Sequence, residues 1–96
     1  MKEIIDRKFK FIAINPVNKH FYTEENAIVF AAKDLALIPT LKAYRCECHA
    51  LGCDKEHLLS IELLIQRVEL YQATEKTHVP DTQLPGEIDR CIYGKV

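Results

Sequence analysis

The segment that decides the fold is residues 46–57, which reads CECHALGCDKEH. Gly52 is the residue type favoured just past the end of a helix, because glycine adopts left-handed backbone angles without strain. Asp54 is a good N-cap, since its carboxylate can accept a hydrogen bond from the free amides of a helix start. The spacing therefore predicts that one helix ends and the next begins within a few residues, as in an antiparallel helical hairpin.

The lengths of these two helices follow from their boundary residues and their apolar spacing. Pro39 suits the first turn of a helix, where the missing amide has no partner to lose, so we expect the earlier helix to open there and to run through Cys48 to near Gly52. The later helix runs from its cap at Asp54 to about Ala73.

The later helix carries two apolar stripes. At about 100° per residue, the first stripe is typical of a core-facing side; it consists of Leu58, Ile61, Leu64, Ile65, Val68 and Tyr71. The second stripe, on the opposite side, consists of Leu59, Leu63 and Leu70. Either this helix is the central layer of the monomer, or the second stripe is the interface of a homodimer.

The earlier helix also has two sides. Leu37, Leu41, Tyr44, Cys48 and Leu51 share its large apolar side. Small residues occupy the other side; they are Ala36, Ala43, Cys46 and Ala50. Since small residues allow a close approach of backbones, we expect either the short helix predicted before this one or a second subunit to lie against them.

The flanking segments predict the rest of an α-rich α+β fold in a single domain, residues 1–96. Aromatic and β-branched residues interrupted by Asn15-Pro16 predict an N-terminal β-hairpin over residues 8–22. A helical core over residues 23–73 then holds a short helix, capped by Thr23 and running to about residue 34, and the antiparallel αα-hairpin of two longer helices. Proline and polar residues predict an extended C-terminal tail over residues 74–96.

Composition and charge exclude several classes of function. Thirteen Lys and Arg against fourteen Asp and Glu leave a net charge of −1, which disfavours nucleic acid as a partner. The N-terminal residues have no apolar run, so we expect no membrane span and a cytoplasmic protein. In that compartment the four cysteines are reduced thiols or metal ligands. With three glycines, the chain has no phosphate-binding loop, and no motif marks an enzyme.

The Cys/His segment contains the strongest chemical signal. Cys48 falls among large apolar residues, so we assign it to the core. The remaining candidates are Cys46, His49, Cys53 and His57, which would meet at the closed end of the helical hairpin. Two thiolates and two imidazoles suit tetrahedral zinc. The alternative is that these are unrelated thiols and surface histidines, and that no cofactor is bound.

Three functional hypotheses follow. The favoured one is a small cytosolic accessory or regulatory protein that acts through contact with another protein, not yet identified, and as a homodimer. A second is a zinc-stabilised module that binds single-stranded nucleic acid, with bases stacked on Phe9 and Phe11 and with Lys8 and Lys10 on the other face of a strand. The third is a thiol enzyme that uses Cys53 as its nucleophile.

Overall fold

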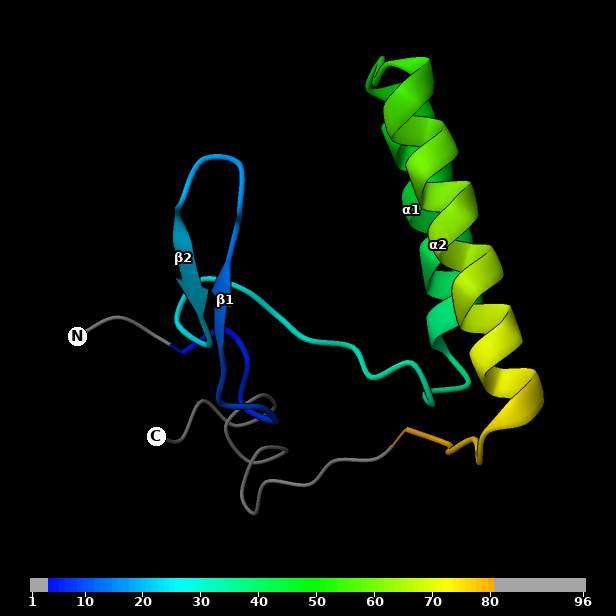
Figure 1. Cartoon of the computed structure of the whole chain (residues 1–96), viewed down its shortest axis with the longest axis horizontal. Coiled ribbons are helices and arrows are strands. Elements are labelled where there is room, and N and C mark those ends of the chain that lie inside the picture. The colour runs from blue at the N-terminus through cyan, green and yellow to red at the C-terminus, as the bar shows by residue number, and fades with distance from the viewer. Residues whose placement is uncertain (1–3, 81–96) are drawn as a thin grey trace, which may run out of the picture. The chain divides into compact units, whose positions relative to one another are not determined.

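The computed structural model describes residues 4–80, which form two compact units, residues 4–29 and Phe30–Pro80 (Figure 1). The elements in chain order are β1 (Ile12–Ile14), β2 (Phe21–Thr23), α1 (Leu37–Ala50) and α2 (Lys55–Thr74). A two-stranded hairpin followed by two long helices confirms the predicted helix-rich α+β class.

Two predictions on domain organisation, the single domain and the extended tail, remain predictions. The division into two units leaves the single domain over residues 1–96 a prediction. Most of the predicted tail, from residue 81 onward, lies outside the described residues. Within residues 4–80, neither helix is long and apolar enough to cross a membrane.

Hydrogen bonds in the turn between β1 and β2 stabilise the hairpin of the first unit. β1 and β2 pair antiparallel, with Ala13 opposite Tyr22. The Asn15 amide donates to the His20 carbonyl at 3.0 Å, which closes the turn. The side chains of Asn15 and Asn18 each accept a hydrogen bond from the amide two residues later, at 2.9 Å, which is the local geometry that makes asparagine a turn former. The predicted hairpin is confirmed, with strands of three residues each.

Asp6 organises the segment before β1. Its side chain is buried, and its carboxylate accepts hydrogen bonds from the amides of Lys8 (2.9 Å), Phe9 (2.9 Å) and Val29 (2.8 Å). The first two bonds bend the chain after Asp6. Phe9 and Phe11 both lie before β1, so they do not share the face of a strand. The Lys8 ammonium lies 5.9 Å from the centre of the Phe9 ring. This geometry differs from the exposed stacking platform that single-strand binding requires.

The short helix predicted over residues 23–34 does not form. In a helix, the Glu24 carbonyl would accept from the amide four residues later; here it accepts from the amides of Ile5 and Asp6, both at 2.9 Å. The Val29 amide is likewise taken by the Asp6 carboxylate. Turns at residues 24–26, 32–33 and 35–36 and an isolated β-bridge between Asp34 and His78 take the place of a helix before α1. Contacts with the N-terminal segment thus override a valid local capping signal.

Replacing Asp6 by asparagine is expected to loosen this unit. Burial alone would raise the pKa of Asp6, but hydrogen bonds from three amides outweigh it and hold that pKa below the usual 3.8. The carboxylate therefore stabilises the folded unit above about pH 3.8, and this stabilisation is lost as the pH falls through the lower folded pKa. In Asp6→Asn we expect amide hydrogen exchange at Val29 to accelerate about tenfold or more at neutral pH.

The matched control is Glu25→Gln, which removes an exposed carboxylate nearby. It should leave exchange at Val29 unchanged. As the pH falls from 3.8 through the lower folded pKa of Asp6, exchange in the wild type should approach that of Asp6→Asn, because the Asp6 carboxylate becomes protonated. Equal protection of Val29 in the wild type and Asp6→Asn at neutral pH would contradict this account.

The predicted helical hairpin is present in the second unit, although α1 starts earlier than predicted. α1 begins at Leu37, two residues before Pro39. Pro39 is therefore still in the first turn, where backbone amides have no hydrogen-bond partner within the helix and a proline removes none. Gly52 has a φ of +82°, as expected just past a helix end. The Asp54 carboxylate caps α2 by accepting the His57 amide at 2.7 Å. Figure 1 shows the two helices side by side.

The core of this unit lies between α1 and α2. Its buried side chains are Leu37, Cys48, Leu58, Ile61, Ile65 and Val68. The core-facing stripe predicted on α2 is therefore correct, except that Leu64 and Tyr71 stay at its exposed margin. An ion pair between Arg45 of α1 and Glu62 of α2, at 2.9 Å, flanks the core.

Hydrogen bonds to backbone carbonyls secure the open end of the hairpin. The Gln72 side chain of α2 donates to the carbonyls of Ala32 (3.0 Å) and Asp34 (2.8 Å), just before α1. The chain after α2 also pairs with this segment, because the Leu35 amide donates to the His78 carbonyl at 3.0 Å. The two ends of the hairpin are thus held by different means, with hydrogen bonds at the open end and helix caps at the closed end.

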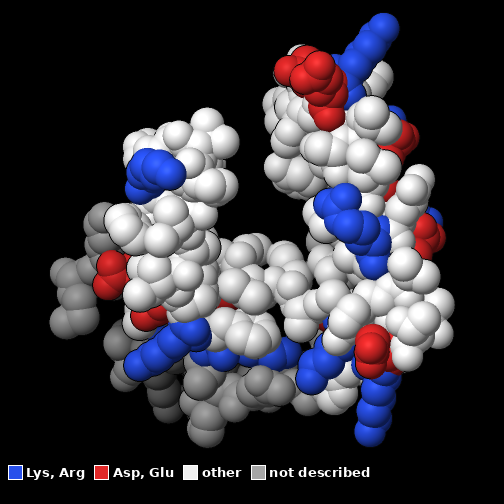
Figure 2. Space-filling model, viewed as in Figure 1, with Lys and Arg blue, Asp and Glu red and all other residues white. Residues whose placement is uncertain are grey.

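The second stripe of α2 is exposed. Leu59, Leu63 and Leu70 have exposed fractions of 52%, 43% and 68%. The small residues on the outer side of α1 are exposed as well. In Figure 2 the charged side chains of the helical unit are interspersed with uncharged surface. No described residue buries either side, so the dimer interface remains a prediction.

Candidate metal centre

The end of α1 brings two cysteines together. The Cys53 amide donates to the Cys48 carbonyl at 3.0 Å, and the Gly52 amide donates to the His49 carbonyl at 3.1 Å. With Gly52 in the left-handed region, this pair of bonds is a Schellman motif. The motif commonly includes a side-chain contact between its first and last residues, which are here Cys48 and Cys53. Cys53 indeed packs against the buried cluster that contains Cys48.

The start of α2 adds a histidine to this pair. Because the Asp54 carboxylate binds the His57 amide, His57 occupies the third position of α2 and its ring turns toward the end of α1. The His57 Nε2 atom lies 3.7 Å from the Cys48 Sγ atom. The ligand atoms of Cys48, Cys53 and His57 all lie within 4.8 Å of one another. Two consecutive helix caps therefore assemble a three-residue group that can hold a metal ion.

The distances and donor types fit zinc. A tetrahedral ion with Zn–S of ~2.3 Å and Zn–N of ~2.05 Å places sulfur and nitrogen ligands about 3.6 Å apart. The observed 3.7 Å between Cys48 and His57 is close to that value. Closing the remaining pairs from at most 4.8 Å requires only side-chain rotation. Thiolate and imidazole are also the donors preferred by zinc and other thiophilic metals.

The surroundings of Cys53 raise the pKa of its thiol. Burial raises the pKa of the Cys53 thiol, and the hydrogen bond and negative charge of Cys48, with the Asp54 carboxylate, raise it further. A thiol nucleophile requires the opposite shift, because the thiolate is the reactive species. The surroundings of Cys53 therefore favour a ligand that is deprotonated on metal binding over the nucleophile of a thiol enzyme.

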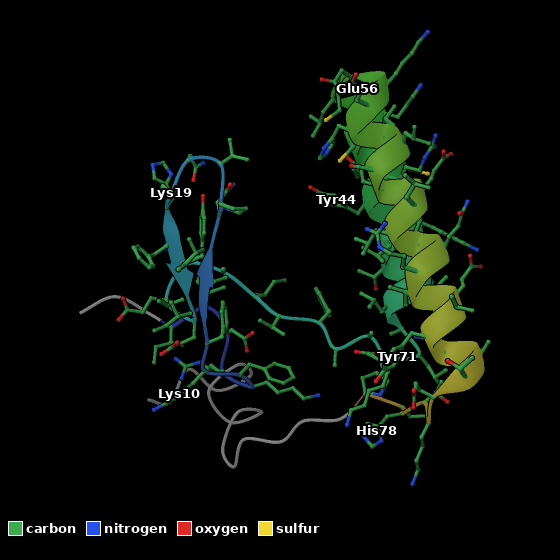
Figure 3. All side chains as sticks on the ribbon, in the orientation of Figure 1. Lys10, Lys19, Tyr44, Glu56, Tyr71 and His78 are labelled. Atoms are coloured by element: carbon green, nitrogen blue, oxygen red, sulfur yellow. The ribbon has the colours of Figure 1, made fainter. Side chains whose placement is uncertain are left out.

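Tyr44 borders the group one helical turn before Cys48. Its side-chain hydrogen bond to Cys48 is the main reason that the pKa of Tyr44 is raised, and the negative charge of Cys48 adds to it. Figure 3 shows Tyr44 projecting from α1 below the closed end, where Glu56 opens α2. The phenol is therefore a polar neighbour of the Cys48 sulfur.

The structure assembles a ligand group that differs from the predicted one. Cys53 and His57 come together, but with Cys48 in place of Cys46 and His49. Cys46 and His49 are both exposed on α1 and do not belong to the group. Cys48 is a core residue as predicted, at 4% exposure, yet its sulfur also faces the group. The available signal was Gly52, since a Schellman motif pairs the residue four before the glycine with the one after it.

The remaining predicted site residues, Leu59, Leu63 and Leu70, lie on the exposed side of α2, away from this group. Among residues 4–80, Cys48, Cys53 and His57 form the one metal-competent group of this kind. The chain matches no protein-family model, and it matches neither a curated protein nor a solved structure.

Proposed function

We propose that this chain is a zinc-stabilised helical hairpin that acts by contact with other proteins, as a small cytosolic accessory protein. The observation that carries the zinc site is the convergence of Cys48, Cys53 and His57 within 4.8 Å. An ion held there links the end of α1 to the first turn of α2. Its thiolates stay available in a reducing compartment, which is the reason for placing the protein in the cytosol.

A metal cross-link would add stability that the small core of this unit does not supply. Only six apolar side chains of the helical hairpin are buried, and none of the described side chains is fully buried. Units of this size seldom gain enough from a hydrophobic core alone, and structural metals commonly supply the difference. Zinc at the closed end would complement the hydrogen bonds that Gln72 makes at the open end.

Titration of the full chain with Co²⁺, a spectroscopic substitute for zinc, tests the site. We expect about one equivalent to bind, with the absorption of thiolate–cobalt charge transfer, and excess zinc to displace it. Cys48→Ser and His57→Ala should each weaken binding at least about tenfold, since even residues that only support ligands have effects of this size.

The controls distinguish the structural ligand set from the one predicted from the sequence. Cys46→Ser and His49→Ala remove residues outside the group and should leave the cobalt affinity unchanged. If these two variants lose cobalt binding while Cys48→Ser retains it, the ligand set is the predicted one and not the structural one. Absence of cobalt binding in the wild type would refute the zinc site altogether.

The exposed stripe of α2 supports a second candidate function, association with a second copy of the chain. Leu59, Leu63 and Leu70, with Gln66 between them, are spaced by four, three and four residues. This is the a/d spacing of a two-stranded coiled coil. The stripe lies opposite the side that packs on α1, and none of the residues 4–80 buries it.

The charges that flank the stripe favour a parallel dimer. In a parallel pair, a residue on one flank faces the residue five positions later on the partner helix, so Glu62 of one copy faces Arg67 of the other. An antiparallel pair would instead bring Glu62 near Glu69, where like charges repel. Glu62 also binds Arg45 in its own chain, and its carboxylate can accept from both.

Sedimentation equilibrium tests the dimer. Arg67→Glu turns two attractive pairs into repulsive ones, so we expect the dissociation constant to rise about tenfold. Lys42→Glu makes the same change in charge on α1, away from the stripe, and should have no effect. A wild type that is monomeric at millimolar concentration, or equal effects of the two variants, would rule out this dimer.

A further inference from the structure

We propose that Cys48 and Cys53 are also a reversible thiol–disulfide pair, oxidised by small-molecule disulfides such as oxidised glutathione. The formation of this disulfide is independent of metal. Its consequence for zinc, the release of the ion, rests on the zinc site proposed above. The pair would make the cross-link between α1 and α2 sensitive to the thiol redox state of the compartment.

The helix cap prepares these two thiols for reaction with each other. Their sulfur atoms lie within 4.8 Å, and the Cys53 amide is bound to the Cys48 carbonyl at 3.0 Å, which keeps the two backbones close. Cys53 lies between the helices, so rotation about its Cα–Cβ bond is not restricted by a preceding helical turn. That rotation can bring the sulfurs to the bonding distance of ~2.05 Å.

The difference in burial between the two thiols sets the order of reaction. Cys53 is partly exposed and Cys48 is buried, so an external disulfide reaches Cys53 first. Cys53 loses its proton to solvent and attacks one sulfur of the oxidant, whose S–S bond breaks and whose second sulfur leaves as a thiol after taking a proton. No described residue around Cys53 activates it as an enzyme nucleophile is activated, so we expect this exchange to take minutes to hours. The Cys48 thiolate then attacks the Cys53 sulfur and expels the second small thiol. The protein thus loses two electrons and two protons, and the oxidant becomes two thiols.

Oxidation removes the metal because it removes ligands. A disulfide sulfur no longer carries the negative charge that binds zinc, so two of the three ligands are lost together. His57 alone is a weak site. In the zinc-loaded protein, the two thiolates supply the electrons, and the products are the disulfide, Zn²⁺ and two small thiolates.

Disulfide mapping of the full chain tests the proposal. The background is the double variant Cys46→Ser, Cys91→Ser, which retains only the pair under test. The zinc-loaded and metal-free forms are each incubated with oxidised glutathione, alkylated, digested and analysed by mass spectrometry, and a chromogenic chelator reports free zinc. We expect an intramolecular Cys48–Cys53 disulfide in both forms, with about one zinc released per disulfide formed. Added dithiothreitol should restore both thiols and zinc binding.

Two variants complete the test. In the same background, Cys48→Ser should stop at the mixed disulfide of Cys53 with glutathione, because no second thiol is near. Tyr44→Phe alters a neighbour of Cys48 without removing a thiol, and should still form the disulfide. Two stable mixed disulfides, or only links between chains, would overturn the proposal. Disulfide formation in a protein that binds no zinc would refute the metal site and leave the redox pair standing.

Discussion

Replacing Ile61 by alanine is expected to cost the Phe30–Pro80 unit about 2–5 kcal/mol of unfolding free energy. Ile61 is 4% exposed and belongs to the cluster formed with Cys48, Leu58 and Ile65. The two helices are too few to collapse around the cavity that the variant leaves. Since the core of a unit this small rarely supplies more than about 3–5 kcal/mol, the loss should remove most of the stability of the helical unit. Urea denaturation followed by far-ultraviolet circular dichroism measures it.

Leu63→Ala is the matched control two residues away on the opposite side of α2. Leu63 is 43% exposed, so in an isolated chain its truncation should change stability by no more than about 0.5 kcal/mol. A larger loss that grows with protein concentration would show that the stripe is buried between two copies. If Ile61→Ala leaves the urea midpoint unchanged, the described core does not hold this unit together.

The helical hairpin could be predicted because its determinants are local. Gly52 ends one helix and Asp54 caps the next, and both act through neighbours within four residues. The short helix after Thr23 could not be excluded in the same way. Its amide and carbonyl groups are bound instead by Ile5 and Asp6, which are distant along the sequence and give no local signal. Sequence patterns therefore predict elements whose hydrogen bonds close within the element, and fail where a remote side chain competes.

The candidate metal ligands were half predictable for a related reason. Cys53 and His57 follow from the positions of the helix ends alone. Cys48 was assigned to the core from the helical periodicity of apolar residues. This periodicity shows which side of a helix a residue occupies, but not which residues after the end of the helix it contacts. At the end of α1 the chain reverses, so a core-facing sulfur also faces the residue after the turn. Phasing and the cap geometry must be combined to recover it.

Loading with zinc is expected to stabilise the protein by about 4 kcal/mol when free zinc exceeds its dissociation constant a thousandfold. The site requires both helices, because Cys48 belongs to α1 and His57 to α2. Unfolding separates these ligands, so the binding energy appears as folding energy. Urea denaturation with and without zinc measures the difference. His57→Ala should abolish the gain, whereas His49→Ala should retain it; equal loss in both would contradict the assigned ligands.

The dependence of this gain on the helix cap can be tested at Gly52. An alanine there meets no side chain within 4 Å, but the φ of +82° strains any residue with a Cβ atom. The metal-free Gly52→Ala variant can relieve that strain by loosening the cap. The zinc-bound variant cannot, because the ion holds Cys48 and Cys53 in place. Zinc should therefore stabilise Gly52→Ala by about 1–2 kcal/mol less than the wild type. Gly52→Asn, which tolerates left-handed angles better, should lose less; if both variants keep the full gain, the Schellman motif does not position the ligands.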